Sequence, residues 1–258
     1  MPNDKEVAAA EMLRLVEQGT TRDPDWFTFG ERRLTPGEVV DLLLPFVTEE
    51  RMGRIAEALS QRTYNLTVVL DGMVDTGNVA AVMRTADGFG LQSFHAVDTA
   101  GTYKHSRRTA QGAQKWLDRY RWRAAAACVE YLRTNDYRLL AAHVDPAATP
   151  IDSVDFSERT ALVFGNELAG VSNELLGMID DTVFIPISGF VESYNVSVAA
   201  GVCLHAARRD RIMRFGRHGD LVGSDRDRLE AVFMMKSVKH HRALIERQLS
   251  ERDDRGPG

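Results

Sequence analysis

Residues 185–209 read IPISGFVESYNVSVAAGVCLHAARR, and the residue types in this stretch change along its length. The apolar run VFIPI that leads into it is typical of a buried strand end, and the small and polar residues SGFVESYN follow. A helix is expected from Asn195, because an asparagine suits an N-cap and the next residues are packed with Val and Ala. The stretch therefore predicts a strand that passes through a polar loop into a tightly packed helix.

The same alternation extends upstream to about Leu66. Near-continuous apolar strands separated by helices are typical of a parallel sheet covered by helices on both faces. We therefore predict an α/β domain, in which ligands bind beyond the carboxyl ends of the strands. The alternating runs are LTVVLDG, NVAAVMRTADGFG, SFHAVD, AAAACVEYLRTND, RLLAAHVD, TALVFGN, SNELLGMID and VFIPI.

The flanking segments have a different pattern. Short helices are expected in PGEVVDLLLPF and EERMGRIAEALSQR, and one long helix in DRDRLEAVFMMKSVKHHRALIERQLSER. The predicted organisation is a mostly helical N-terminal extension (1–62), an α/β domain (63–217) and a helical C-terminal extension (218–258).

The composition favours a cytoplasmic globular protein. With 258 residues, 44% of them apolar, the chain can bury a sizeable core. Cys128 and Cys203 lie far apart, which indicates neither a disulfide framework nor a zinc site, and no metal is expected. The N-terminus lacks the pattern of a signal peptide, and no run of about 18 apolar residues predicts a membrane span.

Positive charge is concentrated locally although the formal net charge is −5. Cations dominate between Lys104 and Arg123, where Asp118 is the one acid, and a second cluster lies between Arg208 and Arg217. Because a polyanion meets the local field, both clusters are candidate RNA contacts, with solvated helix faces as the competing interpretation. The candidates are Arg107, Arg108, Lys115, Arg119, Arg121, Arg208 and Arg211.

The first polar loop at a predicted strand end is DGMVDTGNVAAVMRTADGFG. Asn78 suits a helix N-cap, and Arg84 follows six residues later among small neighbours. A surface arginine with a buried stem is the plainer interpretation of Arg84 taken alone. The pair Gly88 and Gly90 lacks a third glycine and precedes a strand, so no dinucleotide site is expected.

Two further loops are also polar. In TALVFGNELAGVSNELL, Asn166 and Glu167 follow a strand, and Ser172 suits the cap of the next helix. An ordinary strand-to-helix turn is the competing interpretation. The third loop presents the hydroxyl of Ser193 and the amide of Asn195 at the head of a helix, where plain capping would also explain the asparagine.

Together the three loops resemble the three motifs of the SpoU-type RNA 2′-O-ribose methyltransferases of the SPOUT superfamily. The matching features are Asn and, six residues on, Arg in the first loop, G-N-E in the second, and I-P-x6-S-x-N-V-S-V-A-A in the third. The resemblance extends roughly from Thr48 to Arg217. The stretches TAQGAQKW and KSVKHH also resemble the branch that methylates tRNA, whose usual product is 2′-O-methylguanosine 18 of the D-loop.

This resemblance implies a C-terminal deep trefoil knot, in which the loop up to Asn195 helps to hold S-adenosylmethionine in a bent form. It also implies a homodimer with the knot at the interface, and basic clusters along a tRNA track that both subunits share. By motif matching, the residues that would contact the cofactor, largely through backbone groups, are Ala142, His143, Phe164, Gly165, Ile185 and Tyr194.

By the same resemblance, Arg84 matches the family's catalytic arginine in an SN2 methyl transfer from the sulfonium to a ribose 2′-oxygen. A guanidinium is a poor base, so we expect Arg84 to orient the hydroxyl and phosphate and to stabilise the developing oxyanion. No metal is required. The residues that would position Arg84, the cofactor loop and the substrate are Asn78, Glu167, Ser193 and Asn195.

The chain departs from the family pattern at Thr76, where many relatives have proline, and at Tyr194, where leucine is commoner. Its acidic segment of about 1–47 has no counterpart in the shortest relatives, which leaves the substrate open. A methyltransferase of ribosomal RNA shares all three motifs and is therefore an alternative. A catalytically silent RNA-binding homologue is another, although the intact motifs speak against it. A small-molecule α/β enzyme is least supported, because no nucleophile–base pair is visible.

Overall fold

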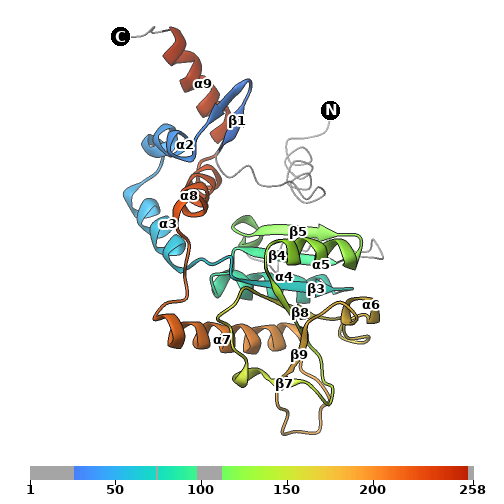
Figure 1. The fold of residues 1–258 in the computed structure, drawn as a ribbon. Helices are drawn as coiled ribbons and strands as arrows, with labels where there is room; N and C mark the ends of the chain where they lie inside the picture. The colour runs from blue at the N-terminus through green and yellow to red at the C-terminus, as the bar shows by residue number, and fades with distance from the viewer. Residues whose placement is uncertain (1–25, 74, 98–111, 255–258) are drawn as a thin grey trace. The chain divides into compact units, whose positions relative to one another are not determined.

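The computed structural model describes residues 26–73, 75–97 and 112–254 (Figure 1). These residues divide into two units, one within 63–218 and the other made of 26–62 together with 219–254. Arg107 and Arg108, which we predicted to contact RNA, lie outside the described residues. In the described part of the chain, no helix has the length and apolar character needed to cross a membrane.

The first unit is built on a sheet of seven strands among its described residues, in the order β5-β4-β3-β8-β6-β9-β7. Every neighbouring pair in this sheet is parallel, which confirms the predicted arrangement. Two of the strands, β5 and β7, were not predicted. The strands are β3 (Leu66–Asp71), β4 (Ser93–Val97), β5 (Asp118–Trp122), β6 (Arg138–Ala142), β7 (Thr149–Pro150), β8 (Thr160–Phe164) and β9 (Asp181–Phe184).

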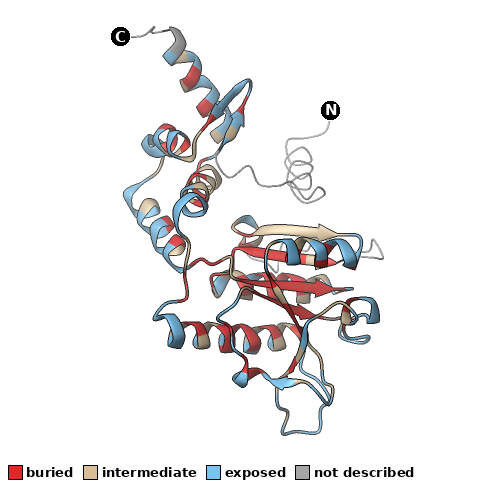
Figure 2. Cartoon of the chain, in the orientation of Figure 1, coloured by how far each residue is buried: buried red, intermediate tan, exposed pale blue. Residues whose placement is uncertain are grey.

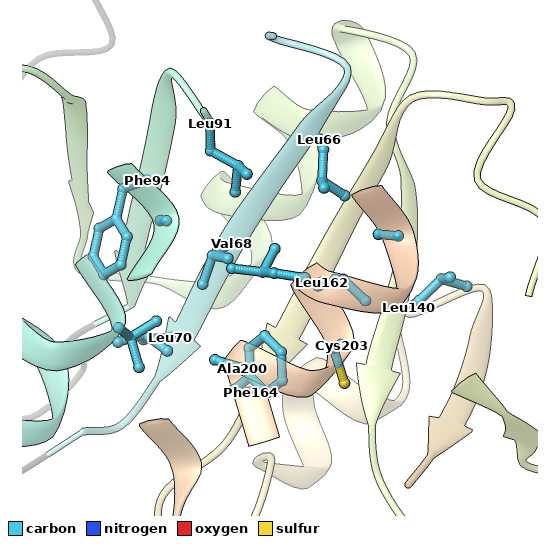
Figure 3. Packing of buried hydrophobic residues seen from close by; sticks show 14 of the residues in the cluster. Leu66, Val68, Leu70, Leu91, Phe94, Leu140, Leu162, Phe164, Ala200 and Cys203 are labelled. Atoms are coloured by element: carbon cyan, nitrogen blue, oxygen red, sulfur yellow. The ribbon is translucent and has the colours of Figure 1, made fainter. Parts of the chain in front are cut away.

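Helices cover both faces of this sheet, as the buried, β-branched strands require. Strands β3 and β8 are buried at every position (Figure 2). On one face, Val68 and Leu70 of β3 join a core cluster with α4 (Thr76–Gly88) and α7 (Val196–Phe215) (Figure 3). On the other, Val69 joins a cluster with α5 (Ala125–Thr134) and α6 (Asn173–Leu176).

Helices α4 and α7 pack directly against each other through small residues. A Cβ added at Gly201 of α7 would lie 3.9 Å from the methyl carbon of Thr85 on α4. Ala200 and Cys203 of α7 are buried against Leu162 and Phe164 of β8 (Figure 3). This close packing places the start of α7 and the start of α4 on the same face of the sheet. The short 3-10 helices of the unit are η2 (Ala113–Lys115) and η3 (Ile151–Ser153).

The second unit contains a hairpin and four α-helices among its described residues. Strands β1 (Phe27–Phe29) and β2 (Arg32–Leu34) are antiparallel, and their three-residue length explains why the sequence pattern did not reveal them. The predicted short helices are present, as α2 (Pro36–Leu43) with η1 (Leu44–Phe46), and as α3 (Glu49–Gln61).

The prediction of one long C-terminal helix is wrong. Two helices are present, α8 (Gly223–Ser237) and α9 (His241–Asp254). Between them Val238 is extended and His240 has a φ of 55°. A left-handed residue cannot continue a right-handed helix, so the chain changes direction there.

Candidate active site

The carboxyl ends of four neighbouring strands lie side by side at one edge of the first unit's sheet. The pairing registers place Leu70 of β3 opposite Phe164 of β8, and Ala142 of β6 opposite Val183 of β9. Strand β6 in turn pairs with β8. The loops that follow these strands are the ones in which the sequence predicted a site.

The first loop is capped by Asp75 and not, as predicted, by Asn78. One carboxylate oxygen of Asp75 accepts hydrogen bonds from the backbone nitrogens of Gly77, at 2.6 Å, and Asn78, at 3.4 Å. A carboxylate satisfies these N–H groups and also complements the positive end of the helix dipole. Asn78 is therefore the third residue of α4, and its half-buried side chain is available for other contacts.

The second loop is a closed turn organised by Asn166. Its backbone nitrogen and oxygen bond Gly170, at 2.9 and 2.8 Å. Its side-chain oxygen accepts from the backbone nitrogens of Leu168, at 2.8 Å, and Ala169, at 3.1 Å. Its side-chain amide donates to the carbonyl oxygen of Gly72 at 3.1 Å, which ties the second loop to the first.

A second link between these loops runs through Ser172. Its hydroxyl accepts from the backbone nitrogen of Leu175 at 3.3 Å, which confirms the predicted cap of α6. Its backbone nitrogen donates to the buried carboxylate of Asp71, at the end of β3, over 2.7 Å. Neither Asp71 nor Asn166 was among the predicted site residues, although Asp71 ends the apolar strand β3 and Asn166 follows the glycine after β8.

The third loop reaches the other two through Asn195. Its side-chain oxygen accepts from the backbone nitrogen of Ser197 at 2.9 Å, which confirms Asn195 as the N-cap of α7. Its amide donates to the side-chain oxygen of Asn78 at 3.2 Å. Asn78 in turn donates its own amide to the carboxylate of Glu167. The structure therefore brings together three of the predicted catalytic residues, one from each loop.

The other two predicted catalytic residues are not joined to this network. Arg84 lies on α4 and is exposed, and Ser193 lies exposed in the loop before α7. In the described part of the chain neither side chain makes a hydrogen bond or an ion pair. Arg84 is thus held on the same helix as Asn78, with its guanidinium open to solvent.

The residues predicted to hold the cofactor follow three adjacent strands. The side chain of Phe164 is buried in the core, so only its main chain faces the sheet edge. A Cβ added at Gly165 would lie 2.0 Å from the carbonyl carbon of Gly170, so the fold tolerates no side chain there. Tyr194 is 40% exposed beside Asn195. The set consists of Ala142 at the end of β6 and His143 after it, Phe164 at the end of β8 and Gly165 after it, Ile185 after β9, and Tyr194.

An additional carboxylate lies close to this edge. The pKa of Asp145 is lowered, first by a hydrogen bond from the side chain of Thr182 and then by one from the backbone of Ala147, with His143 contributing. Asp145 therefore stays ionised beside the end of β6. Among the residues that the structure describes, no three His, Cys, Asp or Glu side chains are grouped as metal ligands.

Among the described residues of the first basic cluster, Arg119 and Arg121 lie on the edge strand β5, and Lys115 is the last residue of the 3-10 helix η2. Arg119 and Arg121 alternate along β5, so they point to the same face of the sheet, and both are half-buried. The ammonium of Lys115 lies over the ring of Trp116, 4.8 Å from its centroid.

The second basic cluster is largely neutralised within the chain. Arg209 pairs with Asp152 at 3.1 Å, and Arg214 pairs with Asp210 at 2.7 Å. Arg211 is 3% exposed and donates to the carbonyl oxygen of Phe156. Its burial contradicts our prediction that Arg211 contacts RNA. Arg208 is half-buried and forms no ion pair among the described residues.

Residues 65–205 match the family model described as "SpoU rRNA Methylase family". The chain belongs to the SpoU methylase family. This confirms the resemblance found in the three loops and, with it, the expected enzyme class.

The chain is similar in sequence and in structure to several methyltransferases of this family. The "tRNA (guanosine(18)-2'-O)-methyltransferase" of Thermus thermophilus is 35% identical over 165 residues, which make up 64% of this chain and 85% of that protein. The crystal structure of the A. aeolicus TrmH/SpoU tRNA modifying enzyme matches with a TM-score of 0.67 at 27% identity, over 74% of this chain and 98% of that one. The SpoU methyltransferase AviRb from Streptomyces viridochromogenes, in complex with AdoMet, matches with a TM-score of 0.53 at 26% identity, over 61% of this chain and 64% of that one.

Proposed function

We propose that this chain transfers a methyl group from S-adenosylmethionine to the 2′-oxygen of a ribose in tRNA, with guanosine 18 of the D-loop as the target. The observation that carries the proposal is the hydrogen-bonded series Asn195, Asn78 and Glu167, which joins the three family motifs at one sheet edge. The name of the Thermus relative supports the choice of tRNA and of guanosine 18.

S-adenosylmethionine, when bound, supplies a methyl group on a positively charged sulfur. Transfer would form a bond between the ribose oxygen and the methyl carbon and break the bond between that carbon and sulfur, which leaves as a neutral thioether, while the 2′-hydroxyl gives its proton to an adjacent phosphate. Arg84 orients the hydroxyl and an adjacent phosphate and stabilises the developing negative charge on oxygen. Asn78, Glu167, Ser193 and Asn195 position Arg84, the cofactor loop and the ribose, because correct placement of the reacting atoms supplies most of the rate enhancement.

The residues at the strand ends fit this cofactor. The short side chain of Ala142 leaves its main chain approachable, as backbone recognition requires. At Gly165 the space that a Cβ would fill is taken by the backbone of Gly170. Ile185 and Tyr194 offer apolar surface for the adenosine part. His143 completes the contacts beside β6, and Phe164 contributes its main chain. No metal takes part in the proposed reaction.

The proposal includes a deep trefoil knot formed by the loops around β9 and the start of α7, within a methyltransferase domain of residues 63–217. It also includes a homodimer. Val198 and Val202, one helical turn apart on α7, are 50% and 38% exposed, and such apolar surface favours burial against a second copy. Arg84, which forms no bond with its own subunit's network, would then act beside the partner's cofactor site. We expect this dimer in the cytoplasm.

RNA contacts are proposed for Lys115, Arg119, Arg121 and Arg208, together with Arg107 and Arg108 in the part of the chain that is not described. Phosphate contacts of this kind provide affinity that falls steeply with salt, while the shape of the RNA provides selectivity.

Ribosomal RNA is a second candidate substrate, because the matching family model is named for an rRNA methylase. The test is to incubate the protein with radiolabelled S-adenosylmethionine and either unmodified tRNA or ribosomal RNA, and to map the labelled nucleotide. Label on the ribose of tRNA guanosine 18 is the expected result. Label in ribosomal RNA alone would keep the chemistry and reject the substrate. No label in either, with cofactor still bound, would favour a silent RNA-binding protein.

The same assay tests the role of Arg84. We expect Arg84→Ala to retain cofactor binding and to lose methyl transfer, because its guanidinium takes part only in the reaction. Cofactor binding is measured by calorimetry, in parallel with the transfer assay. Full activity of Arg84→Ala would overturn the assignment.

A further inference from the structure

The loop that joins β9 to α7 is open to solvent along most of its length. Every residue from 188 to 195 is exposed, and in the described part of the chain the side chains of 188–194 form no hydrogen bond or ion pair. The end of the loop is nevertheless fixed, because Asn195 caps α7 and donates a hydrogen bond to Asn78. The loop therefore presents its side chains to solvent next to the place where the three family motifs meet.

An aromatic ring stands in the middle of this loop. Phe190 has a relative exposure of 109%, more than any other large apolar side chain in the described residues. An apolar ring left in water is unfavourable, and such rings are commonly covered by a ligand or a partner. A flat ring is suited to stack on a nucleobase, and unpaired bases of RNA loops are recognised in this way.

Glu192, two residues further on, carries a negative charge at the same place. It is exposed, and in the part of the chain that the structure describes it has no cationic partner. Three residues of chain span at most about 11 Å, so the main chain of Glu192 lies within that distance of the Asn195 main chain. An RNA substrate brings phosphates to this edge, and a carboxylate repels them. Glu192 therefore opposes binding unless it accepts hydrogen bonds from the RNA.

Guanine is the RNA base that best supplies such hydrogen bonds. Its Watson–Crick edge presents N1–H and the N2 amino group side by side, and the two oxygens of a carboxylate can accept one bond from each. Adenine and cytosine present one amino group next to an unprotonated ring nitrogen, whose lone pair would face the second carboxylate oxygen. Uracil presents one N–H between two carbonyl oxygens. A carboxylate therefore selects guanine both by attraction and by repulsion of the other bases.

The proposed reaction itself does not distinguish one base from another. It takes place on the ribose 2′-oxygen, which all four nucleotides share, and the residues assigned to methyl transfer position the ribose and the reacting atoms. A product restricted to guanosine therefore needs a further residue that contacts the base. Glu192 has the chemistry for this contact, and its loop leads directly into Ser193 and Asn195.

We propose that Glu192 is a specificity-determining residue that selects guanine at the target nucleotide, by accepting hydrogen bonds from N1–H and the N2 amino group, and that Phe190 stacks on the same base. This inference deepens the proposed function and rests on it for the class of substrate, RNA.

The test compares two tRNA transcripts that differ only at position 18. One carries guanosine and the other inosine, which keeps N1–H and lacks the 2-amino group. The ratio of kcat/KM for the two transcripts is measured for the wild type and for Glu192→Ala, Glu192→Gln and Glu158→Gln. Glu158 is the matched control, because it is an exposed acid directly before β8 and so lies at the opposite edge of the sheet.

We expect the wild type and Glu158→Gln to prefer the guanosine transcript about tenfold, as for one hydrogen bond to a charged acceptor. Glu192→Ala should reduce this ratio to within about twofold of unity, since an analogue that lacks the donor then loses nothing. Glu192→Gln replaces one acceptor by a donor and should also lose the preference. An unchanged ratio in Glu192→Ala would overturn the proposal. A raised KM for S-adenosylmethionine with the ratio unchanged would assign the carboxylate to the cofactor instead.

Phe190 is tested on the same transcripts. Stacking tolerates either base, so Phe190→Ala should raise the KM for both transcripts about tenfold, and Phe190→Tyr should restore most of the affinity because the ring is kept. Equal KM values for Phe190→Ala and Phe190→Tyr would reject the stacking contact. Dissociation into monomers of Phe190→Ala alone, seen by sedimentation, would assign the ring to a contact between subunits and reject it too.

The preference for guanosine is also measured as a ratio of dissociation constants, which requires no methyl transfer. A wild type that prefers the guanosine transcript and loses this preference in Glu192→Ala, but labels neither RNA, would contradict the proposed function and support base recognition by Glu192. A wild type with no preference in either measurement would overturn the inference whether or not it transfers methyl groups. Thermal unfolding checks that every variant is folded.

Discussion

The side-chain amide of Asn195 donates a hydrogen bond to the side-chain oxygen of Asn78, 3.2 Å away, although 117 positions separate the two residues in the chain. Both amides have defined orientations. The oxygen of Asn195 is occupied by the backbone nitrogen of Ser197, and the amide of Asn78 is directed at the carboxylate of Glu167. A change in one residue is therefore transmitted to loops that are remote in sequence.

Asn195 has two separable tasks, helix capping and the link to Asn78. Asn195→Asp keeps an acceptor for the cap, and its charge suits a helix N-terminus, but it has no donor for Asn78. Asn78 cannot compensate by turning its amide, because its oxygen would then face Glu167. We expect near wild-type stability with methyl transfer reduced at least tenfold.

Asn195→Ala removes the cap as well and should cost about 1 kcal/mol, which lowers the melting temperature by about 2–4 °C. Calorimetric unfolding and single-turnover transfer measure the two effects separately. Wild-type transfer by Asn195→Asp would show that the link to Asn78 does not matter.

Glu167→Gln tests the charge at the other end of the series. A hydrogen bond to a charged acceptor contributes about 1.5–3 kcal/mol and one to a neutral acceptor about 0.5–1.5, so the substitution should lower kcat about tenfold. The KM for S-adenosylmethionine should change little, because Glu167 orients Asn78. Glu174→Gln, the same change at an exposed position on α6, is the control and should behave as wild type.

Much of the first unit follows from the sequence. The buried strands β3 and β8 were recognisable because a strand covered on both faces is apolar at nearly every position. The cap at Asn195 was recognisable because a short polar side chain stood directly before an apolar helical run, and the cap at Ser172 because Leu175 and Leu176 follow it at helical spacing. The meeting of the loops followed from the parallel sheet, which places all its carboxyl ends at one edge.

Other features of the structure could not be predicted from the local sequence pattern. Asp75 and Asn78, three residues apart, are both suited to an N-cap, and in the structure Asp75 caps α4. The break at His240 reflects a backbone conformation that no glycine or proline announces. The burial of Arg211 did leave a signal, because Leu204 and Ala207 lie seven and four residues before it on the buried face of α7.

The second basic cluster allows a prediction about RNA affinity. Arg208→Ala should weaken tRNA binding several-fold and lower the salt slope by about one, as expected for one lost phosphate contact. Arg214→Ala should leave the slope unchanged, because its guanidinium is already matched by Asp210 at 2.7 Å and Asp155 at 3.0 Å. The two salt titrations are run side by side. Equal salt slopes for both variants would contradict the prediction that Arg208 contacts phosphate and Arg214 does not.

Gly165 allows a comparison with a second loop glycine. A Cβ at Gly165 would lie 2.0 Å from the carbonyl carbon of Gly170, so Gly165→Ala must displace the turn that carries Glu167. We expect a clear loss of stability, on the order of 1–3 kcal/mol as for other overpacked positions, and a loss of transfer. At Gly189 no atom lies within 4 Å of an added Cβ, so Gly189→Ala should fold as stably as wild type. Unfolding in urea would reveal the difference, and equal midpoints would contradict it.

The two cysteines allow a test of the core beneath the site. Burial raises the pKa of Cys203 to about 12, and the pKa of Cys128 is raised too, by burial and then by the charge of Asp71. Since the thiolate is the nucleophile, neither cysteine should react with iodoacetamide in the folded protein at about pH 8.5, and both should react in denaturant.

The raised pKa of Cys203 also predicts how the free energy of unfolding changes with pH. In the unfolded chain the thiols ionise near about pH 8.5, whereas in the folded chain that of Cys203 stays protonated until about pH 12. The folded state therefore binds more protons in this interval, and the free energy of unfolding falls as pH rises through it. Cys203→Ala should flatten this part of the pH profile while lowering stability at neutral pH, because it leaves a small cavity between α7 and the sheet. Rapid alkylation of Cys203 in the native protein, or a pH profile that Cys203→Ala leaves unchanged, would show that α7 does not seal this core.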